Sequence, residues 1–167
     1  ILGAGLGQNV ARQVSLGAGI PIETPALTIN MVCGSGLRAV SMAAQFVESG
    51  QCDIILCGGT ESMTDTPYLL PKARWGHRMG QKTVEDVLHK DGFICPLAKM
   101  FMGDTCELLN KKYGISRQEQ DEFALASQQK AKKAIASGAY REEIVPVEIK
   151  SKSDAVIFDT DEVHKDT

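Results

Sequence analysis

The apolar positions in the first third of the chain predict a strand, a helix and a second strand. Residues 25–29 form a short apolar run, and residues 53–57 form another that is apolar on both faces. Runs of this kind are typical of buried parallel strands. Between them, residues 37–47 carry apolar side chains at helical spacing and Gly50 ends the pattern, which predicts a helix over 35–49. The three elements predict a right-handed βαβ unit and therefore an α/β fold.

Periodicity predicts two more helices, and its absence marks one irregular stretch. Small and apolar residues at helical spacing predict a helix over 7–18. Residues 103–113 predict another helix, in which Leu108 and Leu109 are expected to be buried. The stretch from 65 to 96 has no sustained period, and irregular stretches of such length are usually functional or interfacial.

The last part of the chain predicts a long helix and two strands. Residues 116–119 form a capping box, in which the serine caps the helix and the glutamate reaches back three residues later. The helix that this box opens is expected to end at Gly138. Residues 143–150 and 155–158 then predict two strands, joined by a polar turn at 151–153.

Composition and charge exclude several classes of function. The formal net charge is −3 and the chain has no basic cluster or aromatic-rich stripe, so no nucleic-acid partner is expected. No apolar run is long enough to span a membrane, and no spacing of histidine and cysteine matches a metal site. Five cysteines at irregular spacing indicate reduced thiols rather than a disulfide framework, and hence a cytoplasmic protein.

The candidate chemistry lies at the turn between the first predicted strand and the helix. Cys33 follows the break at Asn30 and stands beside Gly34 and Gly36, which let a substrate approach closely. A thiol at a helix N-terminus faces unpaired backbone N–H groups and the positive end of the helix dipole, and both favour the thiolate. The same N–H groups can hold a carbonyl oxygen as it becomes an oxyanion. For a lone cysteine on such a turn, the competing interpretation is a buried structural thiol.

Both ends of the chain predict that it is an internal piece of a longer protein. Ile1 is not an initiator methionine, and residues 159–167 end the chain without a closing helix or strand. Catalytic partners of Cys33 are therefore expected to lie outside this chain.

Several motifs, in order, resemble one protein family. Residues 30–40 (NMVCGSGLRAV) and 58–63 (GGTESM) look like the thiolases, the acetyl-CoA acetyltransferases. Residues 7–13 (GQNVARQ) are similar to a motif that the family carries upstream. The resemblance covers essentially the whole chain. The Cys-Gly-Ser-Gly sequence and the Gly-Gln-Asn opening look more like the biosynthetic acetoacetyl-CoA branch of the family. Further matches lie at 91–93, 102–103, 116–121 and 143–146.

The resemblance implies an α/β, thiolase-like layered fold. Residues 1–64 would be part of the N-terminal core domain that carries the nucleophile. Residues 65–167 would be part of the loop domain that covers coenzyme A, and the C-terminal thiolase domain would be absent from this chain.

The resemblance also implies a Claisen condensation of two acetyl-CoA to acetoacetyl-CoA and coenzyme A, or the reverse thiolysis. Cys33 would be catalytic: its thiolate would attack the thioester and carry the acyl group, and its backbone N–H would contribute to an oxyanion hole. The family's second cysteine and its histidines would lie in the missing part, so this piece alone is expected to be inactive. No cofactor and no metal are implied, because the coenzyme A thioesters are substrates.

Three residues are assigned to substrate binding by the resemblance. Phe93 and Met102 fall where family members line the pantetheine tunnel, and Lys165 aligns with an arginine near the adenine. A lysine keeps the charge but loses the flat stacking surface. Phe101 stands where the family often has a histidine, which is expected to reshape the acyl pocket. Residues 65–85 resemble the segment through which biosynthetic members assemble, so the resemblance implies a homo-oligomer, either a dimer or a tetramer.

Two alternatives stay open at this point. A ketoacyl-synthase-like condensing enzyme would also place a cysteine on a strand–helix turn, but it would decarboxylate a malonyl donor and usually lacks the motifs at 7–13 and 58–63. A thiolase-like module that binds acyl-CoA or lipid would keep the fold without turnover. The remainder of the gene separates them, since a Cys-Gly-x-Gly motif and two histidine motifs there would indicate the enzyme.

Overall fold

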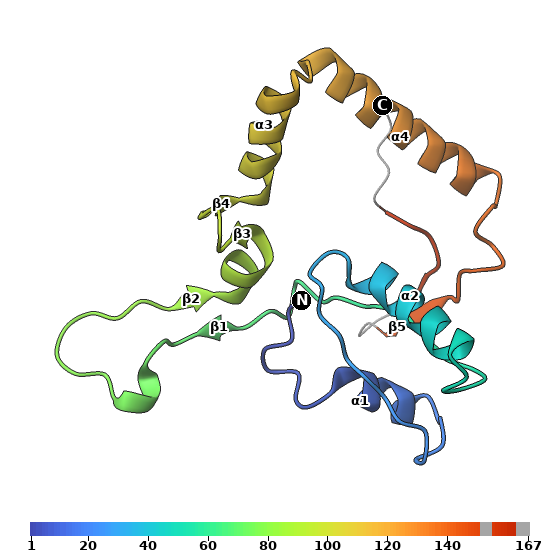
Figure 1. Cartoon of the computed structure of the whole chain (residues 1–167), viewed down its shortest axis with the longest axis horizontal. Helices are drawn as coiled ribbons and strands as arrows, with labels where there is room; N and C mark the ends of the chain where they lie inside the picture. The colour runs from blue at the N-terminus through green and yellow to red at the C-terminus, as the bar shows by residue number, and fades with distance from the viewer. Residues whose placement is uncertain (151–154, 163–167) are drawn as a thin grey trace. The chain divides into compact units, whose positions relative to one another are not determined.

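The computed structural model describes residues 1–150 and 155–162 of the chain (Figure 1). It divides into two compact units, Ile1–Thr105 and Cys106–Thr167. The predicted division at residue 64 stays a prediction, because contacts within the chain do not test it. The helices are α1 (Val10–Gly17), α2 (Ser35–Glu48), α3 (Met102–Tyr113) and α4 (Arg117–Ala136), with a 3₁₀ helix at Ala73–Trp75 and a π-helical segment at Leu88–Phe93.

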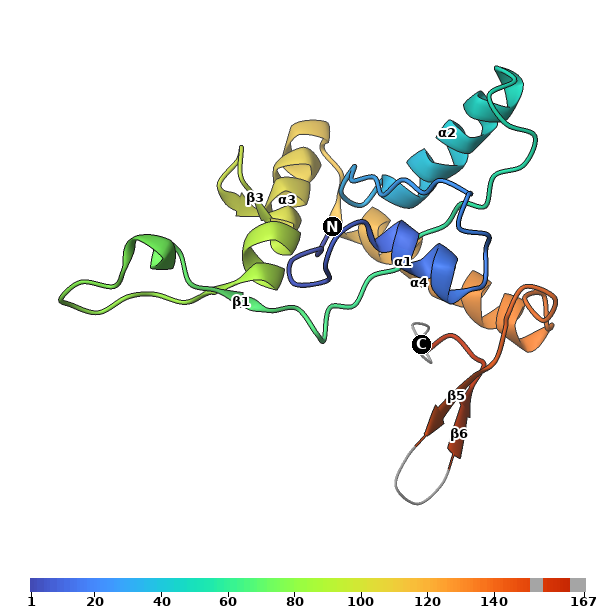
Figure 2. The ribbon, with the colours of Figure 1, turned by 90° about the horizontal axis from the view of Figure 1, so that it is seen from below.

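Three short antiparallel strand pairs complete the secondary structure. They are β1–β2 (Tyr68–Leu69 with Glu85–Asp86), β3–β4 (Ile94–Cys95 with Met100–Phe101) and β5–β6 (Val147–Lys150 with Ala155–Phe158). In the first unit, β1 and β2 run side by side as a narrow arm, with the 3₁₀ helix toward its far end (Figures 1 and 2). This arm occupies the stretch in which the sequence shows no sustained period.

The first two helices are found where the apolar spacing predicts them. α1 begins three residues later than expected because Asn9 is its N-cap, with a left-handed φ of 45° and a side chain that accepts from the N–H of Arg12. α2 runs from Ser35 to Glu48 and the chain turns away at Gly50, whose φ is 70°. The prediction of both helices is confirmed.

The two strands predicted on either side of α2 are not formed. Residues 25–29 and 53–57 pair with no strand in the described part of the chain. A strand exists only through hydrogen bonds to a neighbour, and an apolar run does not supply that neighbour. Ile54 and Leu56, for which the pattern predicts burial, are 89% and 81% exposed. The prediction of a βαβ unit formed within this chain is therefore wrong.

Very little apolar surface is buried within the described residues. The buried apolar side chains there are Leu2, Ala43 and Val87, all in the first unit. Leu2 lies over the π-helical segment, since a Cβ built on Gly92 would come within 3.7 Å of its Cδ2. Leu108 and Leu109 on α3 are 55% and 50% exposed, so the expectation that they are buried is wrong. The described chain covers only about half of each of these two side chains.

The second unit contains α4 and the hairpin β5–β6. The capping box is confirmed: the Ser116 side chain accepts from the N–H of Glu119, and the Glu119 carboxylate accepts from the N–H of Ser116 at 2.7 Å. Gly138, with a φ of 70°, follows the end of the helix as predicted. The two predicted strands are present as a four-residue pair. The polar turn predicted at 151–153 lies outside the described residues.

The capping box predicts a pH-dependent helix. The hydrogen bond from the backbone N–H of Ser116, followed by that from its hydroxyl, lowers the pKa of Glu119 below its ordinary value. The stabilisation is therefore complete above the ordinary pKa of glutamate and is lost as the pH falls through the lowered one. In a synthetic peptide spanning 114–138, circular dichroism is expected to show helicity falling in that acidic range.

Variants of this peptide test the same capping box. Ser116→Ala is expected to lower helix stability by about 1 kcal/mol at neutral pH. Glu119→Gln removes the titrating carboxylate and is expected to abolish most of the pH dependence that the box produces. Ser127→Ala in the helix interior serves as the control and should leave the pH dependence unchanged. A pH response of the Glu119→Gln peptide equal to that of the unchanged peptide would contradict the assignment.

Candidate active site

Cys33 lies on a tight turn that leads directly into α2. Its side chain is exposed. Two backbone hydrogen bonds form the turn: Gly34 N–H donates to the Met31 carbonyl at 3.0 Å, and Ser35 N–H donates to the Val32 carbonyl at 3.2 Å. The cysteine therefore stands two residues before the helix, as the sequence predicts, although no strand precedes it. The competing interpretation, a structural thiol that the rest of the fold buries, stays an alternative, since Ile54 and Leu56 are exposed in this chain as well.

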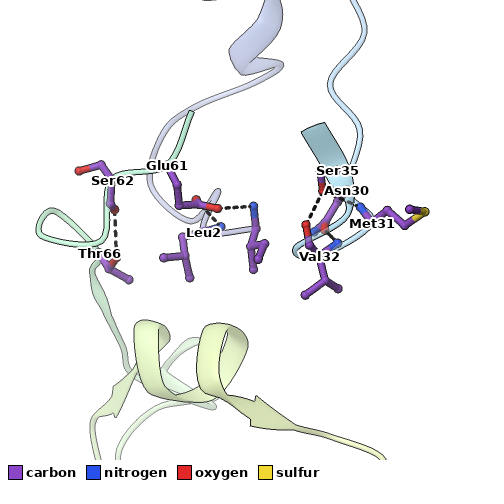
Figure 3. A network of polar contacts seen from close by, with 9 residues as sticks. Leu2, Asn30, Met31, Val32, Ser35, Glu61, Ser62 and Thr66 are labelled. Carbon is purple, nitrogen blue, oxygen red and sulfur yellow. Dashed lines mark hydrogen bonds and ion pairs between the residues drawn. The ribbon is translucent and has the colours of Figure 1, made fainter. Parts of the chain in front are cut away.

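Two side chains reinforce the turn from within (Figure 3). Asn30 Oδ1 accepts from the Val32 N–H at 2.9 Å. The Ser35 hydroxyl accepts from the Met31 N–H at 2.8 Å and donates to the Val32 carbonyl at 2.7 Å. The polar backbone groups of the two residues before Cys33 are thus held mainly by Asn30 and Ser35.

Val32 has an unusual backbone conformation. Its φ is 52°, in the left-handed region, which is a clear outlier for a β-branched residue. A residue held in this region costs on the order of 1–3 kcal/mol and persists only where the surroundings enforce it. The hydrogen bonds from Asn30 and Ser35 supply that enforcement, and they do so immediately before Cys33.

Backbone N–H groups next to the thiol are available as donors. In the described part of the chain, the N–H groups of Cys33 and Gly36 donate to no acceptor. The first N–H groups of a helix point along its axis, and they carry the positive end of its dipole. Gly59 passes close by, since a Cβ built on it would lie 3.8 Å from the Cα of Gly36. The residues after the apolar run 53–57 therefore reach the start of α2.

The chain approaching the turn is held by α1 through Asn9. The Asn9 side-chain amide donates to the Ala26 carbonyl at 3.0 Å, and its Oδ1 accepts from the Thr28 hydroxyl at 2.8 Å. Thr28 in turn accepts from the Ala11 N–H at 3.0 Å. Asn9 therefore caps α1 and ties residues 26–28 to the start of that helix.

Arg12 adds a second attachment one turn along α1. Its guanidinium donates to the carbonyls of Ile22 and Thr24, each at 2.6 Å. Gln13 on the same helix donates to the carbonyls of Leu6 and Gln8, both at 2.9 Å. The polar side chains of the motif at 7–13 are thus used to fix loops around α1, and one of these loops leads to Cys33.

Glu61 fixes the segment that follows Gly59. Its carboxylate accepts from the Leu2 N–H at 3.0 Å and from the amino group of Ile1 at 2.9 Å (Figure 3). Glu61 therefore joins the motif at 58–63 to the first residues of the chain.

The other predicted site residues do not join Cys33 in the described contacts. Phe93 ends the π-helical segment and Met102 begins α3, and both side chains are exposed. Among the described residues, no hydrogen bond or ring contact links either of them to Cys33. Lys165 lies outside the described residues. The assignment of these residues to substrate binding stays a prediction.

Phe101 makes a contact that the sequence does not predict. Its ring meets that of His89 edge-on, with the centroids 5.2 Å apart and an interplanar angle of 79°. His89 also lines a hollow of about 400 Å³ together with Val84, Glu85, Asp86, Lys90 and Ile94. The histidine is therefore packed on an aromatic ring, and in the described chain it belongs to no group of three metal-ligating side chains.

Comparison with known proteins decides the family. The profile of the thiolase N-terminal domain matches residues 1–167. The chain belongs to the thiolase family. An acetyl-CoA acetyltransferase of Syntrophomonas wolfei is 52% identical over 164 residues, which cover 97% of this chain and 41% of the relative. One of Escherichia coli K12 is 48% identical over 166 residues, covering 99% of this chain and 42% of the relative.

A solved structure shows the same fold. The crystal structure of the Acat5 thiolase from Ascaris suum in complex with coenzyme A matches with a TM-score of 0.81 at 37% identity. The match covers 88% of this chain and 38% of the solved one. The α/β thiolase-like fold is therefore confirmed, and this chain spans about two fifths of the length of its thiolase relatives.

The structure shows the role of residues that the sequence alone did not reveal as functional. The thiolase motif at 7–13 is recognisable as a motif, but its role as the support of the nucleophile turn follows only from the contacts of Asn9 and Arg12. The sequence feature that could have predicted this role is residue type, because Asn often caps a helix N-terminus and Arg often donates hydrogen bonds to backbone carbonyls. The Thr28 partner carries no such signal.

Arg12→Lys tests this support. One ammonium cannot reproduce the forked pair of bonds to Ile22 and Thr24, so the variant is expected to lose about 1–2 kcal/mol of stability. The loss would appear as a lower urea midpoint of the complete polypeptide, by which we mean this chain together with the part of a thiolase that extends beyond it. Arg38→Lys on α2 is the matched control and is expected to change stability by less than about 0.5 kcal/mol. Equal midpoints for the two variants would contradict the structural role of Arg12.

Proposed function

We propose that this chain carries the acyl-accepting cysteine of an acetyl-CoA C-acetyltransferase. The observation that supports this most directly is the exposed Cys33 on the turn into α2, in a chain of the thiolase family. Cys33 stands beside backbone N–H groups that find no acceptor among residues 1–150 and 155–162. Relatives at 52% and 48% identity are named acetyl-CoA acetyltransferases.

In the first half-reaction, the Cys33 thiolate attacks the carbonyl carbon of acetyl-CoA. A tetrahedral intermediate forms, with its charge on the former carbonyl oxygen. The carbon–sulfur bond to coenzyme A then breaks, the coenzyme A thiolate leaves and takes up a proton, and acetyl-Cys33 remains. The start of α2 serves this step because its N–H groups face developing negative charge.

In the second half-reaction, another acetyl-CoA loses a proton from its methyl group. The resulting carbon nucleophile attacks the carbonyl of acetyl-Cys33, a carbon–carbon bond forms, and the cysteine leaves as a thiolate. The product is acetoacetyl-CoA, and the reverse sequence is thiolysis. We place the group that accepts the methyl proton in the part of the thiolase relatives that extends beyond this chain.

The oxyanion donor from this chain is the Cys33 N–H. It makes no hydrogen bond in the described structure, and it is attached to the residue whose sulfur forms the new bond. A donor of this kind stabilises charge that appears only during the reaction, and removal of one such donor typically costs about 10²–10³-fold in rate.

Substrate contacts and assembly are further parts of the proposal. Exposed apolar side chains at Phe93 and Met102 suit the pantetheine arm of coenzyme A, and Lys165 suits its adenine end as a cation. The Ascaris suum neighbour was solved with coenzyme A bound. We propose no further cofactor. A homo-oligomer is proposed through the β1–β2 arm, where Trp75 and Met79 are 85% and 99% exposed.

The proposed location is the cytoplasm. Five free cysteines are compatible with a reducing compartment. In the described residues, the helices are too short or too polar to traverse a lipid bilayer.

Labelling of the complete polypeptide tests the nucleophile. Iodoacetamide is expected to modify Cys33 faster than the other four cysteines of residues 1–167, and preincubation with acetyl-CoA is expected to protect it. Peptide mass spectrometry should then find an added acetyl group on Cys33 alone. Equal labelling of all five cysteines, with no effect of acetyl-CoA, would refute the proposal.

A further inference from the structure

We propose that Ser35, with Asn30, is a positioning residue for acyl transfer: it orients the peptide plane that carries the Cys33 N–H. This inference rests on the proposed function, since it concerns the same nucleophile. It assigns a task to two side chains whose described hydrogen bonds are to the backbone of Met31 and Val32.

The planarity of the peptide bond links the Val32 carbonyl to the Cys33 N–H. The Val32 carbonyl and the Cys33 N–H belong to one peptide unit, so they lie in one plane and point in opposite directions. Fixing the carbonyl oxygen therefore fixes the direction of the N–H. The Ser35 hydroxyl donates to this oxygen at 2.7 Å, and the Ser35 N–H donates to it at 3.2 Å. Ser35 thus holds the donor of the proposed oxyanion hole from its far side.

Asn30 and Ser35 also hold the backbone of Val32, the residue from which this plane extends. Val32 has a φ of 52°, which a β-branched residue leaves readily unless it is restrained. The Val32 N–H is bound by Asn30 at 2.9 Å, and the Met31 N–H is bound by Ser35 at 2.8 Å. Release of these bonds would let Val32 relax toward negative φ and turn the Cys33 N–H away from its present direction.

The hydrogen bonds also act on the strength of the donor. A carbonyl that accepts hydrogen bonds polarises its own peptide unit, and chains of such bonds strengthen one another. Two bonds on the Val32 oxygen therefore make the Cys33 N–H a better donor to an oxyanion. Both effects concern the transition state of acyl transfer, in which the oxygen carries charge.

Two reactions at the same sulfur separate this role from a merely structural one. Acetylation by acetyl-CoA passes through an oxyanion, whereas alkylation by iodoacetamide does not develop one at the reacting carbon. In the complete polypeptide, Ser35→Ala is expected to lower the rate constant of Cys33 acetylation by about 10–100-fold. The rate constant of iodoacetamide alkylation at Cys33 is expected to change less than about threefold. The amplitude of the acetylation burst, measured by rapid quench and mass spectrometry, should stay that of the wild type.

Three other variants complete the test. Ser35→Thr keeps the hydroxyl and is expected to retain most of the acetylation rate. Asn30→Ala removes only the bond to the Val32 N–H, and a smaller loss is expected, about 3–10-fold. It also keeps the proposal testable if Ser35→Ala does not fold. Ser41→Ala is the matched control, because the Ser41 hydroxyl donates to the Arg38 carbonyl at 3.0 Å further along α2.

Each outcome bears on one proposal. A wild type that forms no acetyl-Cys33 overturns the proposed function. A wild type that acetylates, with Ser35→Ala and Asn30→Ala equally fast, overturns only the positioning role. Equal losses in acetylation and alkylation would also overturn it, because they would indicate a general disturbance of the turn.

Discussion

Cys33→Ala is expected to abolish acetyl transfer by the complete polypeptide, with a loss of at least about 10⁴-fold in the turnover of acetoacetyl-CoA and coenzyme A. The reason is covalent: alanine provides no atom that can carry the acetyl group between the two thioesters. The exposed position of Cys33 suggests that folding is unaffected, since its side chain fills no buried space. The measurement is acetoacetyl-CoA consumption in the presence of coenzyme A, alongside the urea midpoint.

The chain offers a matched control for this experiment. Cys106 is also a free, exposed cysteine, but it lies on α3. Cys106→Ser is expected to keep the turnover within about twofold of the wild type, as exposed substitutions away from a special feature usually have small effects. Cys33→Ser, which keeps an oxygen in place of the sulfur, is expected to lose nearly as much as Cys33→Ala. Retention of turnover by Cys33→Ala would exclude Cys33 as the acyl carrier.

The polypeptide of residues 1–167, produced by itself, is expected to show neither turnover nor a cooperative unfolding transition. Folding restricts the chain, and the burial of apolar surface supplies most of the free energy that offsets this loss of entropy. In the described residues, only Leu2, Ala43 and Val87 are buried among the apolar side chains, whereas Leu37, Ile54 and Leu56 are exposed. A cooperative fold needs these groups to be covered, and their pattern is that of a core.

Urea titration followed by circular dichroism, together with binding of a hydrophobic dye, measures this expectation. The isolated polypeptide is expected to bind the dye and to lose signal gradually, and the complete polypeptide to unfold in a sharp transition. A second comparison tests the cause: Ile54→Asp is expected to destabilise the complete polypeptide by at least about 3 kcal/mol. It should have almost no effect on the isolated one. A sharp transition of residues 1–167 alone would show that they contain enough core.

Local structure was predictable from the sequence because its causes are local. Helices α1, α2 and α4 follow from apolar spacing, and the end of α2 and the start of α4 follow from Gly50 and the capping box at 116–119. The Asn9 cap, which starts α1 three residues later than expected, was not predicted. Each of these signals acts over four residues or fewer. The turn carrying Cys33 was predictable for the same reason, because an apolar run meets a helix start there.

Structure that depends on distant partners was not predictable. The runs 25–29 and 53–57 have the composition of strands, yet they lack neighbours with which to pair in the described chain. The same limit applies to Leu108 and Leu109, whose burial depends on whatever packs against α3. Periodicity identifies a face that tends to be covered, but it does not supply the element that covers it.

The candidate active site was likewise predictable in part. The residue type and spacing around Cys33 indicated the nucleophile, whereas the left-handed Val32 and its two supporting side chains appeared only in the structure. No sequence rule predicts positive φ at a valine, since this conformation is disfavoured for that residue. The strained residue next to the nucleophile is therefore a product of the surrounding hydrogen bonds.

The attachment of residues 22–26 to α1 has a consequence for protein engineering. Asn9 and Arg12 bind this loop through the carbonyls of Ile22, Thr24 and Ala26. Every amino acid has such a carbonyl, so the loop is held without regard to its side chains. Residues 22–24, whose side chains are exposed, can therefore accept a fluorophore, an affinity handle or altered charge without loosening the path to Cys33.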